Sequence, residues 1–341
     1  MHRRLFALAL AGACYSFLPF ASAQSVPVDA RAPLQPSEVR AWLMRIHGAA
    51  SHSNFQGTFV VSAGGAVSSA RIAHFCEGGN QFERIESLDG QTRHVFRYND
   101  VVHTVWPRVH VAMVEQRDQL SSFPALLQGG DDRIADFYDL HALGAERVAG
   151  YEANVLLLKP RDGARFGYRL WAEKNTGLLL RADVLGERGE VLETSAFSDV
   201  AIGVRSQPET VLQPMKKLGG YRVMRPSLTP TKLDAEGWVM RQTVPGFREV
   251  SCVKRPLENE ADSERGEAAT QALQTIYSDG LTYVSVFIEP FNPQRHARAM
   301  LTSIGATQTL MRRQGDWWVT VIGDVPTMTL RAFANGLERK K

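Results

Sequence analysis

Four histidines lie in successive strand-like segments, an arrangement that could bring imidazole groups together as metal ligands. They are His74, His94, His103 and His110. Zinc sites usually add a thiolate or a carboxylate at fixed spacing, and only Cys76 stands close to one of these histidines. We therefore expect ordinary cross-strand pairs and no metal site.

Catalysis needs a small set of groups held within reach of one another, and the common motifs that provide such a set are missing from the sequence. There is no G-x-S-x-G, no Walker loop, no glycine fingerprint for a dinucleotide, no H-E-x-x-H and no C-x-x-C. We expect no catalytic residues and no cofactor. The pattern favours a binding protein over an enzyme.

The first 23 residues have the features of a secretory signal peptide. Arg3 and Arg4 precede an apolar run, residues 5–20, and the small residues Ala21-Ser22-Ala23 provide a cleavage site before Gln24. The run is shorter than the ~20 apolar residues that a bilayer requires. We expect soluble export, with no later segment that spans a membrane.

The charge balance argues against a general nucleic-acid-binding protein. The chain has 39 basic and 36 acidic residues, and removal of the signal peptide takes away two arginines, which leaves 37 − 36 = +1. Nucleic-acid binders of this size carry a concentrated basic face. The mature chain keeps two cysteines, Cys76 and Cys252. In an oxidising compartment they could pair in a disulfide that joins two domains, or both could be buried free thiols.

The first large region combines one helix with many strands. Val39, Trp42, Leu43 and Ile46 are apolar at helical spacing after Ser37. About eleven strand-like runs follow between residues 55 and 199, separated by turn residues, with an irregular insertion at 121–138. Such a series predicts an antiparallel meander that curls into an incomplete barrel, plugged by helices.

A smaller α/β domain is predicted after a stretch rich in proline and glycine. That stretch, residues 204–236, is expected to be a linker. Beyond it we expect strands at 238–243, 247–254, 281–288, 306–312 and 317–322, a helix at 268–277 and a closing helix at 326–337. The fold class is therefore α+β, with a signal peptide at 1–23, a large domain at 37–203 and a smaller domain at 237–338.

The large sheet carries more apolar side chains than one helix can cover. The set contains Phe59, Val61, Ile72, Phe82, Ile85, Phe96 and Trp106 from strands, with Phe123 and Leu127 from the insertion. The insertion could complete a dry core. Alternatively, these side chains could line a cavity that accepts an acyl chain.

Several strings of residues resemble the MucB/RseB family over nearly all of the mature chain. They are Phe55-Gln56-Gly57-Thr58-Phe59-Val60, the run 79–90 (GNQFERIESLDG), Tyr168-Arg169-Leu170-Trp171 with its continuation 173–180, Phe197-Ser198-Asp199, and the run 315–326 (GDWWVTVIGDVP). Because these strings occur in order behind an export signal, the resemblance is specific.

The resemblance implies a periplasmic regulator. Family members have a half-open barrel like that of the lipoprotein carriers, closed by helices, followed by a smaller domain. They bind the periplasmic domain of an inner-membrane anti-sigma factor (RseA/MucA type) and protect it from regulated proteolysis. The stress sigma factor (sigma-E/AlgU type) then stays inactive until lipid or lipopolysaccharide releases the regulator. A periplasmic lipid or lipoprotein carrier is the alternative function.

Candidate anchors for the partner are Trp317, Trp318 and Phe287. Tryptophan is often a hot-spot residue of protein interfaces. Because consecutive residues of a strand point to opposite faces, only one of the two tryptophans can face a partner, and the other is expected in the core.

Overall fold

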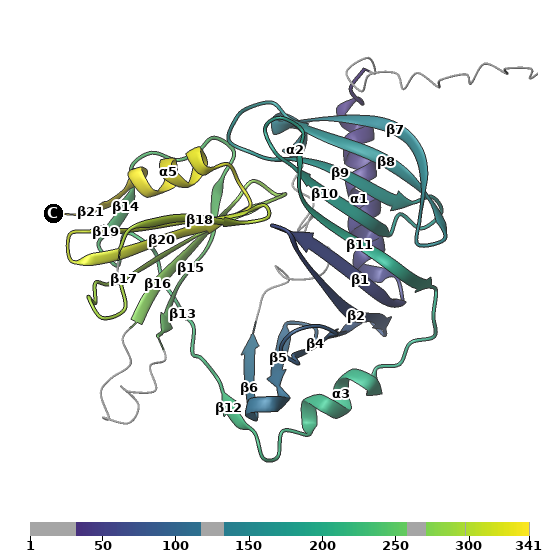
Figure 1. Ribbon diagram of the computed structural model, residues 1–341, viewed down its shortest axis with the longest axis horizontal. Coiled ribbons are helices and arrows are strands. Elements are labelled where there is room, and N and C mark those ends of the chain that lie inside the picture. The colour runs from purple at the N-terminus through teal and green to yellow at the C-terminus, as the bar shows by residue number, and fades with distance from the viewer. Residues whose placement is uncertain (1–31, 117–132, 258–270, 297, 341) are drawn as a thin grey trace, which may run out of the picture. The chain divides into compact units, whose positions relative to one another are not determined.

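A computed structural model describes residues 32–116, 133–257, 271–296 and 298–340. A twelve-stranded sheet forms the first large part of the fold, in the order β12-β6-β5-β4-β3-β2-β1-β11-β10-β9-β8-β7 (Figure 1). Its strands are β1 (Phe55–Ala63), β2 (Ala66–Glu77), β3 (Asn80–Ser87), β4 (His94–Tyr98), β5 (Val101–Trp106), β6 (Val111–Gln116), β7 (Tyr138–Val148), β8 (Tyr151–Pro160), β9 (Gly167–Glu173), β10 (Leu179–Leu185), β11 (Val191–Ile202) and β12 (Arg222–Met224).

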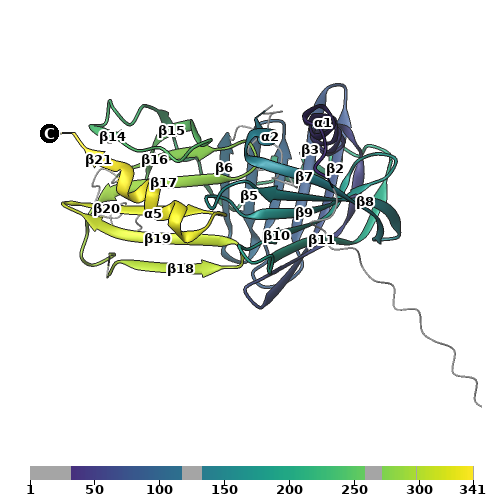
Figure 2. The same ribbon diagram turned by 90° about the horizontal axis from the view of Figure 1, so that it is seen from above.

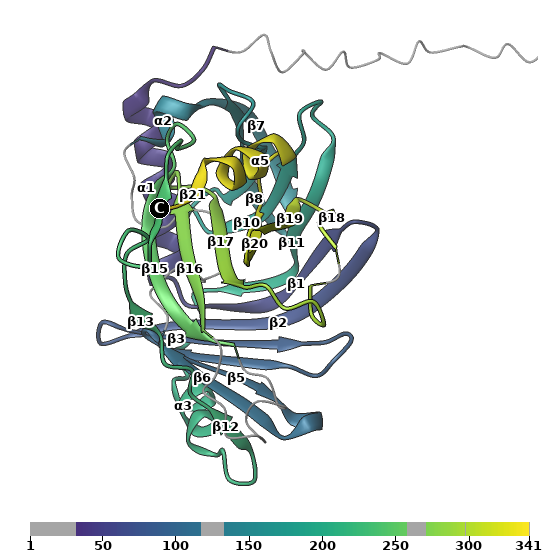
Figure 3. The same ribbon diagram turned by 90° about the vertical axis from the view of Figure 1, so that its left-hand side faces the viewer.

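Two antiparallel meanders, β1 to β6 and β7 to β11, join along β1 and β11. In this pairing Phe55 lies opposite Ile202, and Ala63 lies opposite Glu193. The end strands β12 and β7 do not pair with each other, so the sheet remains open. Figure 3 shows the sheet bending between its two halves. The predicted curled antiparallel sheet is confirmed.

Helix α1 (Pro36–His52) packs on the second meander. It begins one residue earlier than the expected start at Ser37, because proline suits the first helical position and the preceding Gln35 backbone N–H donates to Glu38 Oε2 over 2.8 Å. The buried side chains Val39, Leu43 and Ile46 pack in one apolar cluster with side chains from β7 to β10. The predicted amphipathic helix is confirmed.

The segment 204–236, expected to be a linker, contains regular structure that returns to the large sheet. Helix α3 (Glu209–Lys216) buries Val211 against Phe82 and Phe96, and β12 pairs in parallel with β6. Strand β13 (Thr229–Pro230) pairs instead with the second sheet. The short helix α3 is not predicted from the sequence, because prolines and glycines in the segment are typical of a linker.

The second sheet has seven strands in the order β13-β15-β16-β17-β20-β19-β18. Beyond β13, its strands are β15 (Arg248–Pro256), β16 (Gln271–Ser278), β17 (Tyr283–Pro290), β18 (Met300–Ile304), β19 (Thr307–Gln314) and β20 (Trp317–Gly323). Helix α5 (Thr327–Gly336) packs against β17, β19 and β20 (Figure 2), and a separate pair consists of β14 (Trp238–Met240) and β21 (Leu337–Arg339). The expected smaller α/β part is confirmed.

The helix expected at 268–277 is wrong for the described residues 271–277, which belong to strand β16. Leu273, Thr275 and Tyr277 are buried, whereas Gln274 and Ile276 between them are half-buried. This alternation has the period of a strand, and β16 pairs with β15 on one side and β17 on the other. Pairing on both sides overrides local helix propensity.

Some expectations fall outside the described residues. They are the signal peptide at 1–23 and most of the insertion, including Phe123 and Leu127. The described end of the insertion forms α2 (Ile134–Phe137), which is followed directly by β7. Ile134 and Tyr138 are both buried in the cluster that contains α1.

Candidate functional site

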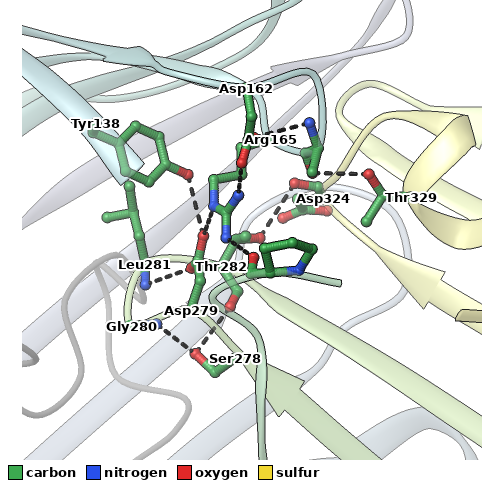
Figure 4. A network of polar contacts seen from close by, with 12 residues as sticks. Tyr138, Asp162, Arg165, Ser278, Asp279, Gly280, Leu281, Thr282, Asp324 and Thr329 are labelled. Atoms are coloured by element: carbon green, nitrogen blue, oxygen red, sulfur yellow. Dashed lines mark hydrogen bonds and ion pairs between the residues drawn. The ribbon is translucent and has the colours of Figure 1, made fainter. Parts of the chain in front are cut away.

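A buried ion pair joins the large sheet to the small one. Arg165, in the loop between β8 and β9, donates from Nε to Asp279 Oδ2 over 2.7 Å, and Asp279 lies in the turn between β16 and β17 (Figure 4). Both side chains have 0% exposure. Buried charges of opposite sign are tolerated only when their remaining hydrogen-bonding groups are also satisfied. We call this contact and its surroundings the junction.

The other guanidinium nitrogens of Arg165 have partners as well. Nη1 donates to Asp162 Oδ2 and Nη2 donates to the carbonyl oxygen of Pro245, each over 2.5 Å. The guanidinium lies 4.3 Å from the ring centre of Phe137 and 5.0 Å from that of Phe247. Arginine suits this position because its planar fork can hydrogen-bond in plane and stack on rings at the same time.

Gly246 lets the small sheet's loop approach Arg165. Its φ is +86°, and a Cβ atom there would lie 2.2 Å from Arg165 Nη2 and 2.6 Å from the Phe137 ring. No side chain fits at such distances, and the left-handed backbone also favours glycine. The junction therefore depends on glycine at this position.

The carboxylate of Asp279 also organises its own turn. Oδ1 accepts hydrogen bonds from the backbone N–H groups of Leu281 and Thr282, over 3.0 and 2.9 Å. The Tyr138 hydroxyl lies 3.5 Å from Oδ2, and burial, followed by the charge of Asp279, raises the pKa of Tyr138 well above its usual value. One carboxylate thus connects the turn, Arg165 and the core tyrosine.

Two turns of the small sheet place apolar side chains in the core of the large one. Leu281 and Ala306 are 3% and 0% exposed, and both belong to the apolar cluster that contains Tyr138, Tyr168 and the buried face of α1. The Thr329 hydroxyl, from α5, donates to the Ala164 carbonyl oxygen over 2.8 Å. Part of the large sheet's core is therefore completed by the small sheet.

Acidic side chains lie near the turn between β18 and β19, which contains Ala306. Burial raises the pKa of Glu193, on β11, and the nearby carboxylate of Asp324 raises it further, although the backbone N–H of Ala306 donates to Glu193. Asp324 itself accepts from the Thr307 hydroxyl over 2.6 Å. The junction therefore contains carboxyl groups from both sheets.

The cavity residues predicted from sequence divide between the two faces of the large sheet. Strand pairing puts Phe59, Val61, Ile72, Ile85 and Trp106 on one face and Phe82 and Phe96 on the other. Phe82 and Phe96 pack beneath α3. Residues 82 and 85 are three positions apart in one strand, so the pleat itself separates them. The seven described candidates therefore do not share one face, and a role in lining a cavity stays a prediction.

The face with Ile72 and Ile85 also carries a buried polar row. His74, Glu83 and Arg97 lie side by side across β2, β3 and β4, and each is 4% exposed. Burial raises the pKa of Glu83 to about 7, although the charge of Arg97 opposes the shift. Burial also lowers the pKa of His74, whose Nδ1 lies 2.9 Å from the Ser53 carbonyl oxygen.

The three predicted partner anchors do not share one surface, because Trp317 points to the opposite face of the small sheet from Trp318 and Phe287. Trp318 is buried and stacks on His296 with ring centres 4.8 Å apart, whereas Trp317 is half-buried, edge-on to Trp238. Phe287 is half-buried and lies opposite Thr320, on the face of the small sheet that carries Trp318. Their role in partner binding stays a prediction.

Cys76 and Cys252 are free thiols. Cys76 is on β2 and its Sγ donates to the Ser51 carbonyl oxygen over 2.9 Å, while Cys252 is buried in the core of the small sheet. Of the two alternatives raised by the sequence, the structure has the unpaired one. Burial raises the pKa of both thiols, that of Cys252 to about 11, which makes them poor nucleophiles.

The junction is not evident from the sequence. Arg165 and Asp279 are far apart in the chain, and neither belongs to a recognised motif. The local signal was the sequence Ser278-Asp279-Gly280, since an aspartate before glycine is typical of a turn that the side chain caps. Nothing local indicates that the buried partner of this aspartate is Arg165.

Two kinds of feature are missing from the described part of the chain. No group of three or more histidine, cysteine, aspartate or glutamate side chains is placed to hold a metal ion there. Within the same residues, no helix combines the length and the apolar character that crossing a bilayer requires.

Comparisons with known proteins agree over both parts of the chain. The family model of the MucB/RseB N-terminal domain matches residues 38–215, and that of the MucB/RseB C-terminal domain matches residues 232–338. The sigma factor AlgU regulatory protein MucB of Pseudomonas aeruginosa is 30% identical over 308 residues, which are 88% of this chain and 90% of that protein. The sigma-E factor regulatory protein RseB of Escherichia coli K12 is 24% identical over 304 residues, 87% of this chain and 90% of that one.

Solved structures give the same result. A crystal structure of MucB in complex with MucA(peri) has a TM-score of 0.66 and 27% identity, and the match covers 90% of this chain and 100% of that one. MucB crystallised alone has a TM-score of 0.62, also at 27% identity, over 89% of this chain and 98% of that one. The two domain matches in order, the whole-chain similarity and the shared fold establish that this chain belongs to the MucB/RseB family.

Proposed function

We propose that this chain is a periplasmic, non-enzymatic regulator that binds the periplasmic domain of an inner-membrane anti-sigma factor. The observation that carries the proposal is the family match over both domains, together with the likeness to MucB crystallised with MucA(peri). The relatives named above are sigma factor regulatory proteins. Binding would protect the anti-sigma factor from regulated proteolysis.

The proposal includes lipid or lipopolysaccharide as the signal that ends this binding. The junction supports a route for the coupling, because Leu281 of the small sheet is part of the same apolar cluster as Tyr138, Tyr168 and α1. An acyl chain that entered this cluster would compete with Leu281 for the same contacts. A ligand shifts an equilibrium only when it binds the two arrangements differently, and this competition would supply the difference.

The charged part of the junction would make the change cooperative. If Leu281 left the core, the turn that holds Asp279 would move with it, since Asp279 accepts from the backbone N–H groups of Leu281 and Thr282. The ion pair with Arg165 would then open. Lipid binding to the large domain would thereby alter the arrangement of the small domain and its hold on the anti-sigma factor.

The test is calorimetric titration of the mature protein, from Gln24, with the periplasmic domain of the host's anti-sigma factor, with and without lipopolysaccharide fragments. We expect saturable binding that the fragments weaken. A parallel digestion of the anti-sigma domain with the site-1 protease should slow when the regulator is present. Absence of binding in every condition would contradict the proposal and favour the lipid carrier.

A further inference from the structure

Strand β18 is an exposed edge of the small sheet. It lies last in the strand order and pairs only with β19 among the strands described, and all five of its residues are exposed. Its sequence, Met300-Leu301-Thr302-Ser303-Ile304, is mostly apolar and has no charged residue. Met300 and Leu301 are each 41% exposed and Ile304 is 69% exposed. Figure 2 shows β18 at the border of the sheet.

The opposite edge of the same sheet is protected in a way that β18 is not. That edge is β13, which has two residues and includes Pro230. Natural proteins commonly block sheet edges with short strands, prolines or charged side chains, because an unblocked edge pairs with other chains. The absence of these features from β18 marks it as a strand on which another extended chain can dock.

A pocket lies where β18 and β19 meet helix α5. Its volume is about 320 Å³, and its lining includes Leu301, Leu310, Arg312, Arg331 and Asn335. Leu301 lies opposite Leu310 in the strand pairing. An incoming strand beside β18 would direct alternate side chains to the face of the sheet on which this pocket lies.

The charge of the pocket indicates which side chain it accepts. Arg331 is exposed on α5, and the described residues give it no ion-pair partner, while no acidic residue lines the pocket. Arg312 is held in place by Asn335 Oδ1, over 2.7 Å, and by the Ala334 carbonyl oxygen. Carboxylates pair well with arginine side chains at such positions.

We propose that β18 docks an extended, acidic segment of the periplasmic partner as an additional strand, with an aspartate or glutamate directed toward Arg331. Only an extended backbone matches a row of strand N–H and C=O groups, and the exposed apolar side chains and the arginine then select its sequence. This inference rests on the proposed function and adds the place and the chemistry of contact.

The experiment measures the affinity of the full-length mature protein for the anti-sigma periplasmic domain in two pocket variants. We expect Leu301→Glu and Arg331→Glu each to weaken binding at least about tenfold, as truncation of an interface hot spot does. Val67→Glu is the matched control, because Val67 is also an exposed apolar residue, 67% exposed, but lies on β2 in the other sheet. The affinity of this variant for the partner should stay within about twofold of the wild-type value.

Hydrogen exchange of the wild-type complex gives a readout that needs no substitution. The backbone N–H groups of β18 that point away from β19 should exchange more slowly when the partner is bound, because an added strand would accept hydrogen bonds from them. Thermal melts of each variant check that the fold is retained.

The outcomes separate this inference from the proposed function. If the wild-type protein does not bind the partner, the proposed function itself fails. If the wild-type protein binds while both variants match Val67→Glu and residues 300–304 gain no protection, docking at β18 is overturned. Variants that lose self-association in sedimentation but keep partner affinity would also overturn it, because β18 would then pair with a second copy.

Discussion

Arg165 and Asp279 show how one buried ion pair can hold two sheets together. The arginine has three hydrogen-bond partners from three segments of the chain, and the aspartate also holds its own turn. Such a pair adds little to stability compared with an apolar replacement, but loss of one member leaves a buried charge without compensation. We therefore expect the pair to act on the specificity of the contact between the sheets more than on net stability.

Arg165→Met should therefore destabilise the protein by about 3 kcal/mol, since the buried carboxylate of Asp279 would lose its cation. The double variant Arg165→Met/Asp279→Asn should recover a large part of that loss, because asparagine is uncharged and still accepts from the backbone N–H groups of Leu281 and Thr282. Urea unfolding measures both. Equal stabilities for the single and the double variant would show that the charge itself is unimportant.

Glu83 should make stability depend on pH in the direction opposite to most acidic residues. Its pKa is about 7 in the folded protein, against 4.5 for an ordinary glutamate, so the native state binds a proton more tightly than the unfolded chain. The stabilisation of the folded state that comes from this protonation is fully present below pH 4.5. It is lost as pH rises through 7, which lowers the free energy of unfolding by about 3 kcal/mol in total.

Glu83→Gln should remove this pH dependence, because glutamine does not titrate. The measurement is the free energy of unfolding of both proteins at several pH values between 4.5 and 8. We expect the free energy of unfolding of the variant to rise relative to that of the wild type as pH increases. Two parallel curves would exclude Glu83 as the source of the effect.

At the scale of elements, the sequence predicts strands in which apolar and polar residues alternate, and it predicts long helices. Helix α1 and the strands of both meanders follow their apolar periodicity. The sequence of strand β16 predicts a helix because its residues have mixed propensity, whereas pairing with β15 and β17 decides its structure. Strand β18 carries no alternation of burial, so periodicity could not indicate it.

The junction could not be predicted for a different reason. Periodicity identifies which side of an element is buried, but it does not identify the distant residue that the side contacts. Arg165 and Asp279 each lie in a turn, where a charged residue is ordinarily solvated. Their burial follows from how the two sheets pack, which only the three-dimensional structure contains.

Helix α3 should contribute measurable stability although it is short. Val211 is 0% exposed where α3 packs on the sheet. Val211→Ala should lower the free energy of unfolding by about 2 kcal/mol through lost apolar burial. Lys216→Ala, at the exposed end of the same helix, is the control and should leave stability unchanged. If both substitutions have the same small effect, α3 does not act as a cover for the sheet.

At the scale of the whole molecule, the two sheets share part of one core. Leu281 and Ala306 reach the cluster around Tyr138 and α1, and Thr329 is bonded to Ala164. We expect a single calorimetric unfolding transition for the wild-type protein, because neither part keeps its full core without the other.

Leu281→Asp should separate this transition into two, since a carboxylate cannot stay in the apolar cluster and the turn must leave it. The same substitution should weaken the anti-sigma domain's binding and its response to lipopolysaccharide fragments, if coupling passes through Leu281. Differential scanning calorimetry and titration measure the two effects. A variant that melts in one transition and responds normally to the fragments would exclude this route.

The pairing of β1 with β11 has a consequence for the order of folding. The first meander cannot complete its hydrogen bonding at β1 until β11 has been made, since Phe55 lies opposite Ile202. During synthesis β1 therefore has an unpaired edge while most of the domain is still absent, and unpaired edges associate with other chains. Contacts this distant in sequence also form slowly. The newly made chain should depend on a chaperone that shields β1 until its late partner arrives.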